Sequence, residues 1–315
     1  MNKNTPILII GFGSIGRRHY ANLLKLGYKN VWVYDINQRR IKNYELRITK
    51  LSKSNLQNFK IVFVCSPNHL HLKHALAAVK AGCDLFIEKP LSHNLKGVAW
   101  LSKLARKNRL INMVACNMRF HPALEFVKKC LQTRKLGKIY SIAHECGHYL
   151  PFWRKAEDYR KNYAAKKSTG GGIILDDVHE FDLLFWLNNF SAVKKRFLIF
   201  DHISDLRIET EDMSLAGYEF DNKVFGLVKS DYLQKYYSRS VKIVGEKGNL
   251  IWDYKENIVW FADEKRKNKL LTIKNYDSNE MYVRELEYFL NSVRTRKKTE
   301  NDIAHARTVL KNCLP

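Results

Sequence analysis

An apolar run at residues 7–10, Ile-Leu-Ile-Ile, leads directly into Gly-Phe-Gly-Ser-Ile-Gly at residues 11–16. A strand followed by G-x-G-x-x-G and then by a helix is typical of a dinucleotide-binding turn. Gly11 would allow the tight turn, Gly13 would let a pyrophosphate approach the backbone, and Gly16 would let the helix pack closely on the strand. We therefore expect the chain to open with a dinucleotide-binding fold.

Neighbouring residues favour one cofactor over another. The amides of Ser14 and Ile15, at the start of the helix, would face the phosphate charge. Asp35 ends the next predicted strand, where a carboxylate would bind the ribose hydroxyls and repel a 2′-phosphate. The sequence thus favours NAD over NADP, although Arg39 and Arg40 keep NADP as the alternative. A purely structural alternative is that Asp35 only caps the turn after it.

Strands and helices alternate through the first third of the chain. Apolar strands are predicted at 7–10, 31–34, 61–65, 84–88 and 111–116, with helices at 14–25, 70–81 and 95–107 between them. Such continuous apolar strands are typical of a parallel sheet buried on both faces. We expect a Rossmann-type, doubly wound α/β domain over residues 1–118, with a short helix and a weak strand in the ambiguous region 36–60.

The pattern changes after residue 118. Short strands with turn signals are predicted at 215–220, 224–233, 241–244, 250–252 and 258–261, after a strand at 138–149. Short connections indicate a mostly antiparallel sheet. Helices are predicted at 122–132, 173–188, 280–294 and 302–312. We assign residues 119–315 to a second, α+β domain that binds the substrate and carries a large open sheet.

The loop Ser66-Pro67-Asn68-His69-Leu70-His71 follows the apolar strand at 61–65. Ligands of open parallel sheets bind beyond the carboxyl ends of the strands. We expect Ser66, Pro67, Asn68 and His71 to contact the cofactor, with Asn68 and His71 as its main polar partners. Asn68 has the alternative, or additional, role of a helix N-cap.

Glu88-Lys89-Pro90 ends another buried strand of the same predicted sheet. An ammonium there would lie near the nicotinamide, and burial would help it to lose its proton. We count Glu88 and Lys89 among the cofactor contacts. A dinucleotide turn together with such a lysine predicts a nicotinamide-dependent oxidoreductase.

A second polar cluster follows the glycine triplet 170–172. On one continuous helix, Asp176 and His179 would be neighbours at i and i+3, and Asp182 would follow one turn later. A histidine flanked by carboxylates can act in acid-base catalysis with its tautomer fixed. The alternative for such a pair is a purely structural role.

Composition narrows the class of protein. The net charge of +24 comes from short, dispersed basic clusters, and no nucleic-acid or metal-binding motif is present. The six cysteines stand singly, which predicts buried free thiols in a reducing cytoplasm. No signal peptide and no membrane-length apolar segment is predicted. We expect no metal, no nucleic acid and no membrane partner.

These motifs together resemble the glucose–fructose oxidoreductase/inositol dehydrogenase (Gfo/Idh/MocA) family. The motifs that carry the resemblance occur in the family's order: GFGSIG, the loop at 66–71, EKP at 88–90, Asn117-x-Arg119-Phe120, Phe152-Trp153-Arg154 and GGG-x-x-x-D-x-x-H-x-x-D at 170–182. The resemblance implies a Rossmann domain and an open sheet through which family members commonly form homodimers or homotetramers. It also implies hydride transfer at a sugar, cyclitol or nucleotide-sugar carbon.

The resemblance implies roles for individual residues. Lys89 would be the catalytic lysine, His179 the acid-base residue and Asp176 its partner. Substrate contacts would come from Arg119, Trp153, Arg154 and Asp182. The family's commoner spacing is Asp-x-x-x-His, so Asp177 rivals Asp176 as the partner of His179. The shorter spacing resembles a branch linked to bacterial surface-carbohydrate synthesis.

The sequence thus predicts an NAD(P)-dependent dehydrogenase or reductase that acts on a CH–OH group of a sugar, cyclitol or nucleotide sugar. The alternative is a non-catalytic dinucleotide- or sugar-binding regulator of the same fold. Such a regulator would be expected to lack Lys89 or His179, and both are present.

Overall fold

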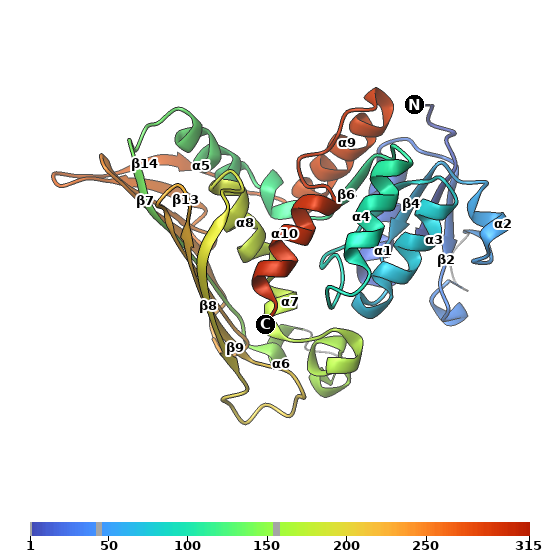
Figure 1. Cartoon of the computed structure of the whole chain (residues 1–315), viewed down its shortest axis with the longest axis horizontal. Helices are drawn as coiled ribbons and strands as arrows, with labels where there is room; N and C mark the ends of the chain where they lie inside the picture. Colours follow the sequence, from blue (N-terminus) through green and yellow to red (C-terminus); the bar gives the residue numbers. More distant parts are fainter. Residues whose placement is uncertain (1, 42–45, 154–157) are drawn as a thin grey trace. The chain divides into compact units, whose positions relative to one another are not determined.

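The computed structural model describes residues 2–41, 46–153 and 158–315, and the chain folds as two compact units (Figure 1). The first unit comprises Met1–Asn117 and Asn279–Lys311, and the second comprises Met118–Ser278 and Asn312–Pro315. Among the described residues, none of the helices combines the length and the apolar character needed to cross a membrane.

The first unit is built on a six-stranded sheet in which every pairing is parallel. The spatial order is β3-β2-β1-β4-β5-β6, the order of a dinucleotide-binding sheet. Its strands are β1 (Ile7–Ile10), β2 (Val31–Tyr34), β3 (Arg47–Ile48), β4 (Ile61–Val64), β5 (Asp84–Ile87) and β6 (Asn112–Val114). The doubly wound parallel fold predicted from the sequence is confirmed.

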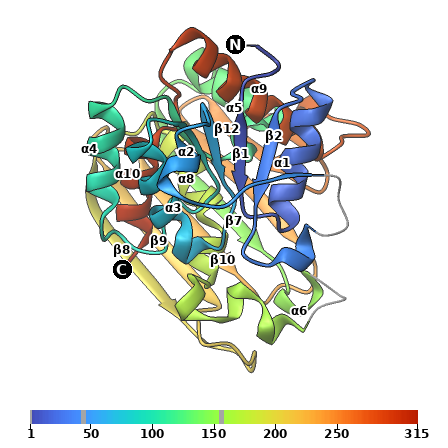
Figure 2. The same cartoon turned by 90° about the vertical axis from the view of Figure 1, so that its right-hand side faces the viewer.

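Helices connect these strands and bury the centre of the sheet, which explains why the central strands are apolar in sequence. The α-helices are α1 (Ser14–Lys25), α2 (Lys53–Leu56), α3 (His71–Lys80) and α4 (Val98–Lys107), with 3-10 turns η1 (Gln38–Arg40) and η2 (Asn68–Leu70). Helix α1 lies alongside β1 and β2 (Figure 2). Every residue of β1, β4 and β5 is buried, so these strands have no solvent-exposed face.

The chain's last two long helices are α9 (Asn279–Thr295) and α10 (Ile303–Cys313), and α9 with most of α10 groups with the first unit. This differs from the sequence-based division, which assigned all of 119–315 to the second domain. On α9, Phe289 packs against the rings of Phe63 and Phe86, while Glu285 accepts a hydrogen bond from the Cys116 amide.

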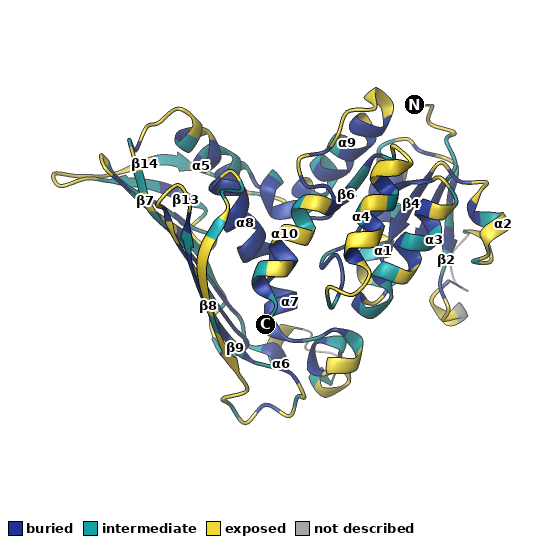
Figure 3. Cartoon of the chain, in the orientation of Figure 1, coloured by how far each residue is buried: buried dark blue, intermediate teal, exposed yellow. Residues whose placement is uncertain are grey.

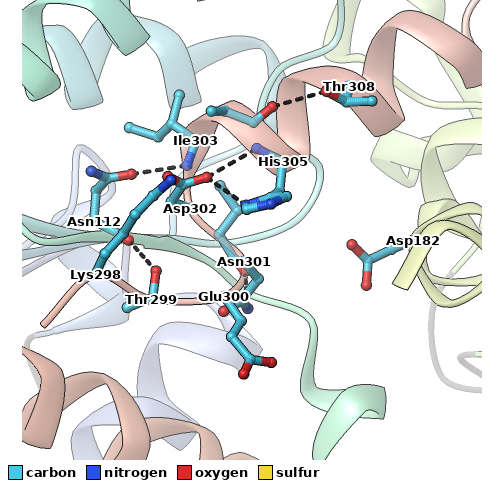
Figure 4. A network of polar contacts seen from close by, with 12 residues as sticks. Asn112, Asp182, Lys298, Thr299, Glu300, Asn301, Asp302, Ile303, His305 and Thr308 are labelled. Carbon is cyan, nitrogen blue, oxygen red and sulfur yellow. Dashed lines mark hydrogen bonds and ion pairs between the residues drawn. The ribbon is translucent and has the colours of Figure 1, made fainter. Parts of the chain in front are cut away.

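Polar contacts fasten α10 to β6 (Figure 4). The side chain of Asn112 accepts a hydrogen bond from the Ile303 amide, and the Thr299 hydroxyl donates to the Asn112 carbonyl. Asp302 accepts from the amide of His305, and Asn301 donates to the Val114 carbonyl. The C-terminal helices therefore complete the first unit.

The second unit contains an eight-stranded sheet in the order β14-β13-β12-β11-β7-β10-β9-β8. All neighbours are antiparallel except β7 and β10, which are parallel. Its strands are β7 (Ile139–Gly147), β8 (Val193–Asp201), β9 (Met213–Phe220), β10 (Phe225–Asp231), β11 (Ser238–Gly245), β12 (Gly248–Asp253), β13 (Ile258–Ala262) and β14 (Lys267–Thr272). The predicted large, mostly antiparallel sheet is confirmed; β8 and β14 were not among the predicted strands.

Helix α8 (Val178–Leu187) is buried at every position and packs on β7 and β10. The strand β8 is largely exposed, as its yellow colour in Figure 3 shows. The unit's other helical segments are α5 (Pro122–Gln132), α6 (Leu150–Trp153), α7 (Ile173–Asp176) and the 3-10 turns η3 (Asn117–Phe120), η4 (Tyr159–Lys161), η5 (Tyr163–Ala165) and η6 (Lys167–Thr169).

Candidate functional site

The three glycines after β1 have different surroundings. Gly11 has a positive φ of +99°, and a Cβ built there would lie 2.5 Å from the Cys65 carbonyl oxygen. A Cβ at Gly16 would lie 2.0 Å from the carbonyl oxygen of Gly11. At Gly13 the nearest described neighbour would be Nη1 of Arg40, 4.0 Å away. The turn and the helix packing thus require glycine at 11 and 16, while the backbone at 13 is open to a ligand.

The start of α1 is suited to an anion. Gly13 precedes the helix without a side-chain cap, and the first turn contains no acidic residue. The first amides of a helix lack intrahelical acceptors and carry partial positive charge. Ser14, at the first helical position, is exposed. These features fit the pyrophosphate of a dinucleotide.

Asp35 lies at the end of β2 and is 3% exposed. Its Oδ2 accepts a hydrogen bond of 2.7 Å from the Phe12 amide, and its Oδ1 accepts one of 2.7 Å from the Asn37 amide. Nη1 of Arg40 lies 3.6 Å from Oδ2. Asp35 therefore orders the glycine turn and its own turn at once, in a position that fits a ribose.

Two arginines follow β2, and they differ in their contacts. Arg40 is the one whose guanidinium lies beside Asp35 and Gly13. Arg39 is exposed, and its amide donates to the side chain of Asn37. From the sequence, Arg39 and Arg40 together keep NADP as the alternative, and of the two the structure brings Arg40 closer to the turn.

The loop after β4 is held by histidines. His71 is 1% exposed, with Nε2 2.6 Å from the Ser66 carbonyl oxygen and Nδ1 2.7 Å from the Pro90 carbonyl oxygen. The Ser66 hydroxyl lies 2.9 Å from Nδ1 of His74. Asn68 begins η2 after Pro67, and α3 starts only at His71 without a side-chain cap, so the structure does not show Asn68 as the N-cap of α3.

Glu88 and Lys89 come directly after β5. Oε1 of Glu88 lies 2.6 Å from Nε2 of the fully buried His19, and Oε2 accepts a hydrogen bond of 3.2 Å from the Lys89 amide. Burial opposes ionisation of Glu88, but the hydrogen bond from His19 and the charge of Lys89 outweigh it, and the pKa of Glu88 lies below its ordinary value. The Glu88 carboxylate thus helps to hold the backbone of Lys89 in place.

The second unit corrects one expectation. Residues 173–188 were predicted to form a single helix, with Asp176 and His179 three apart on one face. The helix is instead interrupted at Asp177, whose backbone (φ −96°, ψ 25°) ends α7 and precedes α8. Asp176 and His179 therefore belong to different helices, and the helical-neighbour argument for their pairing fails.

Asp176 has partners that the sequence did not indicate. The hydroxyls of Tyr163 and Tyr232 donate to its two carboxylate oxygens, the first at 2.7 Å. Burial, followed by the charge of Asp176, holds the pKa of Tyr232 well above its ordinary value, so the phenol remains a donor. Because these tyrosines are 13 and 56 residues away from Asp176, no local spacing could have pointed to them.

Asp177 and His179 are both buried. Burial raises the pKa of Asp177. The charges of His148 and Arg239 lower it by less, so the pKa lies above its ordinary value. Asp177 stays the alternative to Asp176 as the partner of His179.

Arg119 and Asp182 form a buried bidentate ion pair. Nε of Arg119 lies 2.7 Å from Oδ2 of Asp182, and Nη2 lies 2.6 Å from Oδ1. The guanidinium also lies 5.8 Å from the ring centroid of Trp186 and 5.4 Å from that of Phe190. The two residues expected to line a pocket are thus brought together and fix η3 against α8.

A further buried charge cluster was missed by the sequence analysis. Glu180 is fully buried, with Oε1 2.8 Å from Nη2 of Arg239 and Oε2 3.5 Å from Nδ1 of His144. The ion pair with Arg239 ties α8 to β11, and the contact with His144 ties it to β7. Polar residues that alternate along a strand normally indicate a solvent-exposed face, so Arg239 of β11 and His144 of β7 could not be recognised as buried from the sequence.

Among the predicted substrate contacts, Trp153 is 43% exposed and packs against the rings of His148 and Tyr163 at centroid distances of 5.3 and 6.3 Å. Arg154 lies outside the described residues. Lys89 belongs to the first unit and His179 to the second.

Two family profiles match the chain. Residues 6–116 match the family described as "Oxidoreductase family, NAD-binding Rossmann fold", and residues 124–251 match the "GFO/IDH/MocA C-terminal domain". Myo-inositol 2-dehydrogenase from Thermotoga maritima is 24% identical over 303 residues, which is 91% of this chain and 87% of that protein. Levoglucosan dehydrogenase from Pseudarthrobacter phenanthrenivorans is 32% identical over 136 residues, which is only 42% of this chain and 34% of that protein.

A solved structure shows the same fold over almost the whole chain. Levoglucosan dehydrogenase in complex with NADH and levoglucosan superimposes with a TM-score of 0.84 at 16% identity, covering 98% of this chain and 94% of that chain. The matched profiles and the two-unit architecture agree with the resemblance read from the sequence motifs. The chain is a member of the Gfo/Idh/MocA family of oxidoreductases, with an NAD-binding Rossmann fold in its N-terminal part.

Proposed function

We propose that this chain is an NAD-dependent dehydrogenase that transfers hydride between the nicotinamide C4 and a carbinol or keto carbon of a sugar, cyclitol or nucleotide sugar. One observation carries the proposal. The glycine turn after β1, the acid after β2 and the Glu88–Lys89 pair after β5 all follow the carboxyl ends of strands in the same parallel sheet. Ligands of such sheets bind at that edge.

Residues of the first unit would hold the cofactor. The amides of Ser14 and Ile15 would bind the pyrophosphate, Asp35 would bind a ribose, and Ser66 with Asn68 would cover the cofactor from the loop after β4. When bound, NAD supplies the hydride acceptor. The two backbone hydrogen bonds of Asp35 support NAD over NADP, because they fix a carboxylate that would repel a 2′-phosphate. Arg40, with Nη1 3.6 Å from that carboxylate, keeps NADP as the alternative.

The reaction must also move the proton of the substrate hydroxyl. We assign it to His179 as the acid-base residue, with Lys89 as the catalytic lysine. Asp176, held by its two tyrosines, would provide a fixed negative charge in the second unit. Arg119, Asp182 and Trp153 would contribute to substrate binding, with Trp153 offering an exposed ring to the apolar face of a sugar.

The substrate class is supported by the relatives, whose names describe oxidation of inositol and levoglucosan. Both substrates are rings with several hydroxyl groups. A role in bacterial surface-carbohydrate synthesis stays part of the proposal, resting on the short Asp-x-x-His spacing at Asp176 and His179.

The test is reduction of NAD, followed by its absorbance, with panels of inositols, hexoses, anhydrosugars and UDP-sugars, and the same panels with NADP. We expect turnover with at least one ring polyol and a preference for NAD. Absence of turnover on every panel would contradict the proposal, whether or not the protein binds NADH.

We also propose that the chain forms a homodimer or homotetramer through the open sheet. Phe197, Ile199 and Phe225 expose 51%, 63% and 60% of their surface on β8 and β10. Exposed apolar groups gathered on one sheet are typical of an interface. Sedimentation should show an oligomer, and replacing Ile199 with Lys should dissociate it.

A cytoplasmic location is the final part of the proposal. All six cysteines are buried free thiols, which is the state that a reducing compartment maintains. Fractionation of cells that express the protein would test this assignment.

A further inference from the structure

One buried ring joins two loops of the first unit. His71 has Nε2 2.6 Å from the carbonyl oxygen of Ser66 and Nδ1 2.7 Å from that of Pro90. Ser66 lies in the loop that follows β4, and Pro90 lies in the loop that follows β5, its parallel neighbour. The ring is 1% exposed. A single imidazole therefore connects the two loops at the carboxyl edge of the sheet.

The partners of this ring set its proton count. A backbone carbonyl oxygen can only accept a hydrogen bond, and a neutral imidazole has only one N–H. Both contacts of His71 are hydrogen bonds only when the ring carries two protons. A neutral ring holds one loop and turns a lone pair toward the carbonyl of the other.

The surroundings of His71 shift its pKa in opposite directions. Burial lowers the pKa of His71, the two carbonyl acceptors and the Glu88 carboxylate raise it, and Lys89 lowers it again. His74, from the same helix, has its pKa lowered to about 4, first by burial and then by His71. The second proton of His71 is therefore held weakly, and the second tether depends on pH.

The backbone on both sides of Lys89 is fixed by a histidine. Before it, Glu88 accepts the Lys89 amide and is itself held by His19 at 2.6 Å. After it, the Pro90 carbonyl is held by His71 at 2.7 Å. The direction in which the Lys89 side chain leaves the sheet thus depends on two buried rings.

We propose that His71 is a positioning residue: its contact with Pro90 fixes the backbone of Lys89, and its contact with Ser66 fixes the loop that covers the cofactor. This inference rests on the proposed function, which gives Lys89 and the Ser66 loop their roles. The two contacts serve different steps, so they can be separated by substitution.

Two variants each keep one contact. In His71→Asn the amide nitrogen takes the place of Nδ1 and can still donate to Pro90, whereas in His71→Gln it takes the place of Nε2 and can still donate to Ser66. His74→Asn is the matched control, because it alters a buried histidine of the same helix that contacts the Ser66 hydroxyl rather than either carbonyl.

The measurements are kcat and the dissociation constant for NADH, followed by nucleotide fluorescence. His71→Gln is expected to lower kcat roughly tenfold or more, since small displacements of reacting groups are costly, with NADH affinity within about twofold of wild type. His71→Asn is expected to weaken NADH binding and to leave kcat within about threefold. His74→Asn leaves both carbonyl contacts of His71 in place, so it should show neither the selective loss of kcat nor the selective loss of NADH affinity.

Equal losses of kcat and affinity in the two His71 variants, or effects no larger than those of the control, would overturn the proposal. If the variants do not fold, the wild-type protein still decides: nitrogen NMR of the His71 ring should show its titration, and kcat or NADH affinity should fall as pH rises through it. No change across that titration would also overturn the proposal. Should the wild type show no turnover with any sugar, the proposed function fails, while NADH affinity and the NMR titration still test the tether.

Discussion

Nε2 of His19 lies 2.6 Å from Oε1 of Glu88, which makes a fully buried histidine the partner of the carboxylate directly before Lys89. Removing one partner of a buried pair leaves the other without compensation and costs about 3–5 kcal/mol. We expect His19→Ala to lower the free energy of unfolding by about 3 kcal/mol, and His19→Gln, which keeps a donor, by less. Urea denaturation followed by circular dichroism measures both.

The same pair predicts a dependence on pH. The pKa of Glu88 in the folded protein lies below its ordinary value of 4.5, so its contribution to stability is present above about pH 4.5 and is lost as the pH falls through the folded pKa. Without His19, the strongest influence that opposes burial is lost, so the pKa of Glu88 rises relative to that in the wild type. Acid unfolding of His19→Ala should therefore begin at a higher pH than that of wild type; superimposable acid transitions would contradict the assignment.

The ion pair of Arg119 and Asp182 predicts non-additive losses. Arg119→Met should destabilise the protein by about 3–5 kcal/mol, because it strands a buried carboxylate. The double variant Arg119→Met with Asp182→Leu should be more stable than Arg119→Met alone. Urea midpoints of the four proteins in this cycle test the pairing, and strictly additive losses would argue against it.

Gly13 and Gly16 form a matched pair of substitutions. An alanine at 16 would place Cβ 2.0 Å from the Gly11 carbonyl oxygen, so Gly16→Ala should cost about 2 kcal/mol of stability or more. Gly13→Ala meets no such obstacle and should fold with nearly wild-type stability. Its methyl group would instead occupy the approach of the pyrophosphate and weaken NADH binding about tenfold, or about 1.4 kcal/mol. Unchanged NADH affinity in Gly13→Ala would show that the dinucleotide binds elsewhere.

Tyr232 tests the environment of Asp176. A hydrogen bond to a carboxylate contributes about 1.5–3 kcal/mol, so Tyr232→Phe should lower stability by about 2 kcal/mol and the partly buried Tyr163→Phe by less. If Asp176 serves turnover, both variants should also lower kcat while the NADH dissociation constant stays constant. A kcat equal to that of wild type in both would assign Asp176 a structural role only.

The strands that the sequence failed to predict are β8 and β14, the two edges of the eight-stranded sheet. An edge strand has one neighbour and needs no buried face along its whole length. Val193–Asp201 is exposed or half-buried throughout, and Lys267–Thr272 is rich in lysine, so neither shows the alternation that revealed the inner strands. By contrast, β1, β4 and β5 were predictable because burial on both faces favours a continuous apolar run, which only Asp84 at the start of β5 interrupts.

The interruption at Asp177 and the placement of α9 could not be predicted from the sequence, for similar reasons. No glycine or proline marks the break between α7 and α8, and apolar residues stand on both sides of the Asp176–Asp177 pair. Helix α9 is amphipathic, which predicts a buried face but not the rings of Phe63 and Phe86 on which Phe289 packs. Motifs with fixed local spacing, such as the glycine turn, were read from the sequence, whereas contacts between distant segments, such as Tyr232 with Asp176, could not be.

The central claim is that Lys89 serves turnover rather than structure or cofactor binding. Replacing Lys89 with Met and measuring NADH affinity, the urea midpoint and kcat on a turned-over sugar tests it most directly. The account predicts nearly unchanged affinity and stability with kcat lowered at least about a hundredfold, the size of effect typical of a lost proton-transferring group. A variant that keeps wild-type kcat would contradict the account.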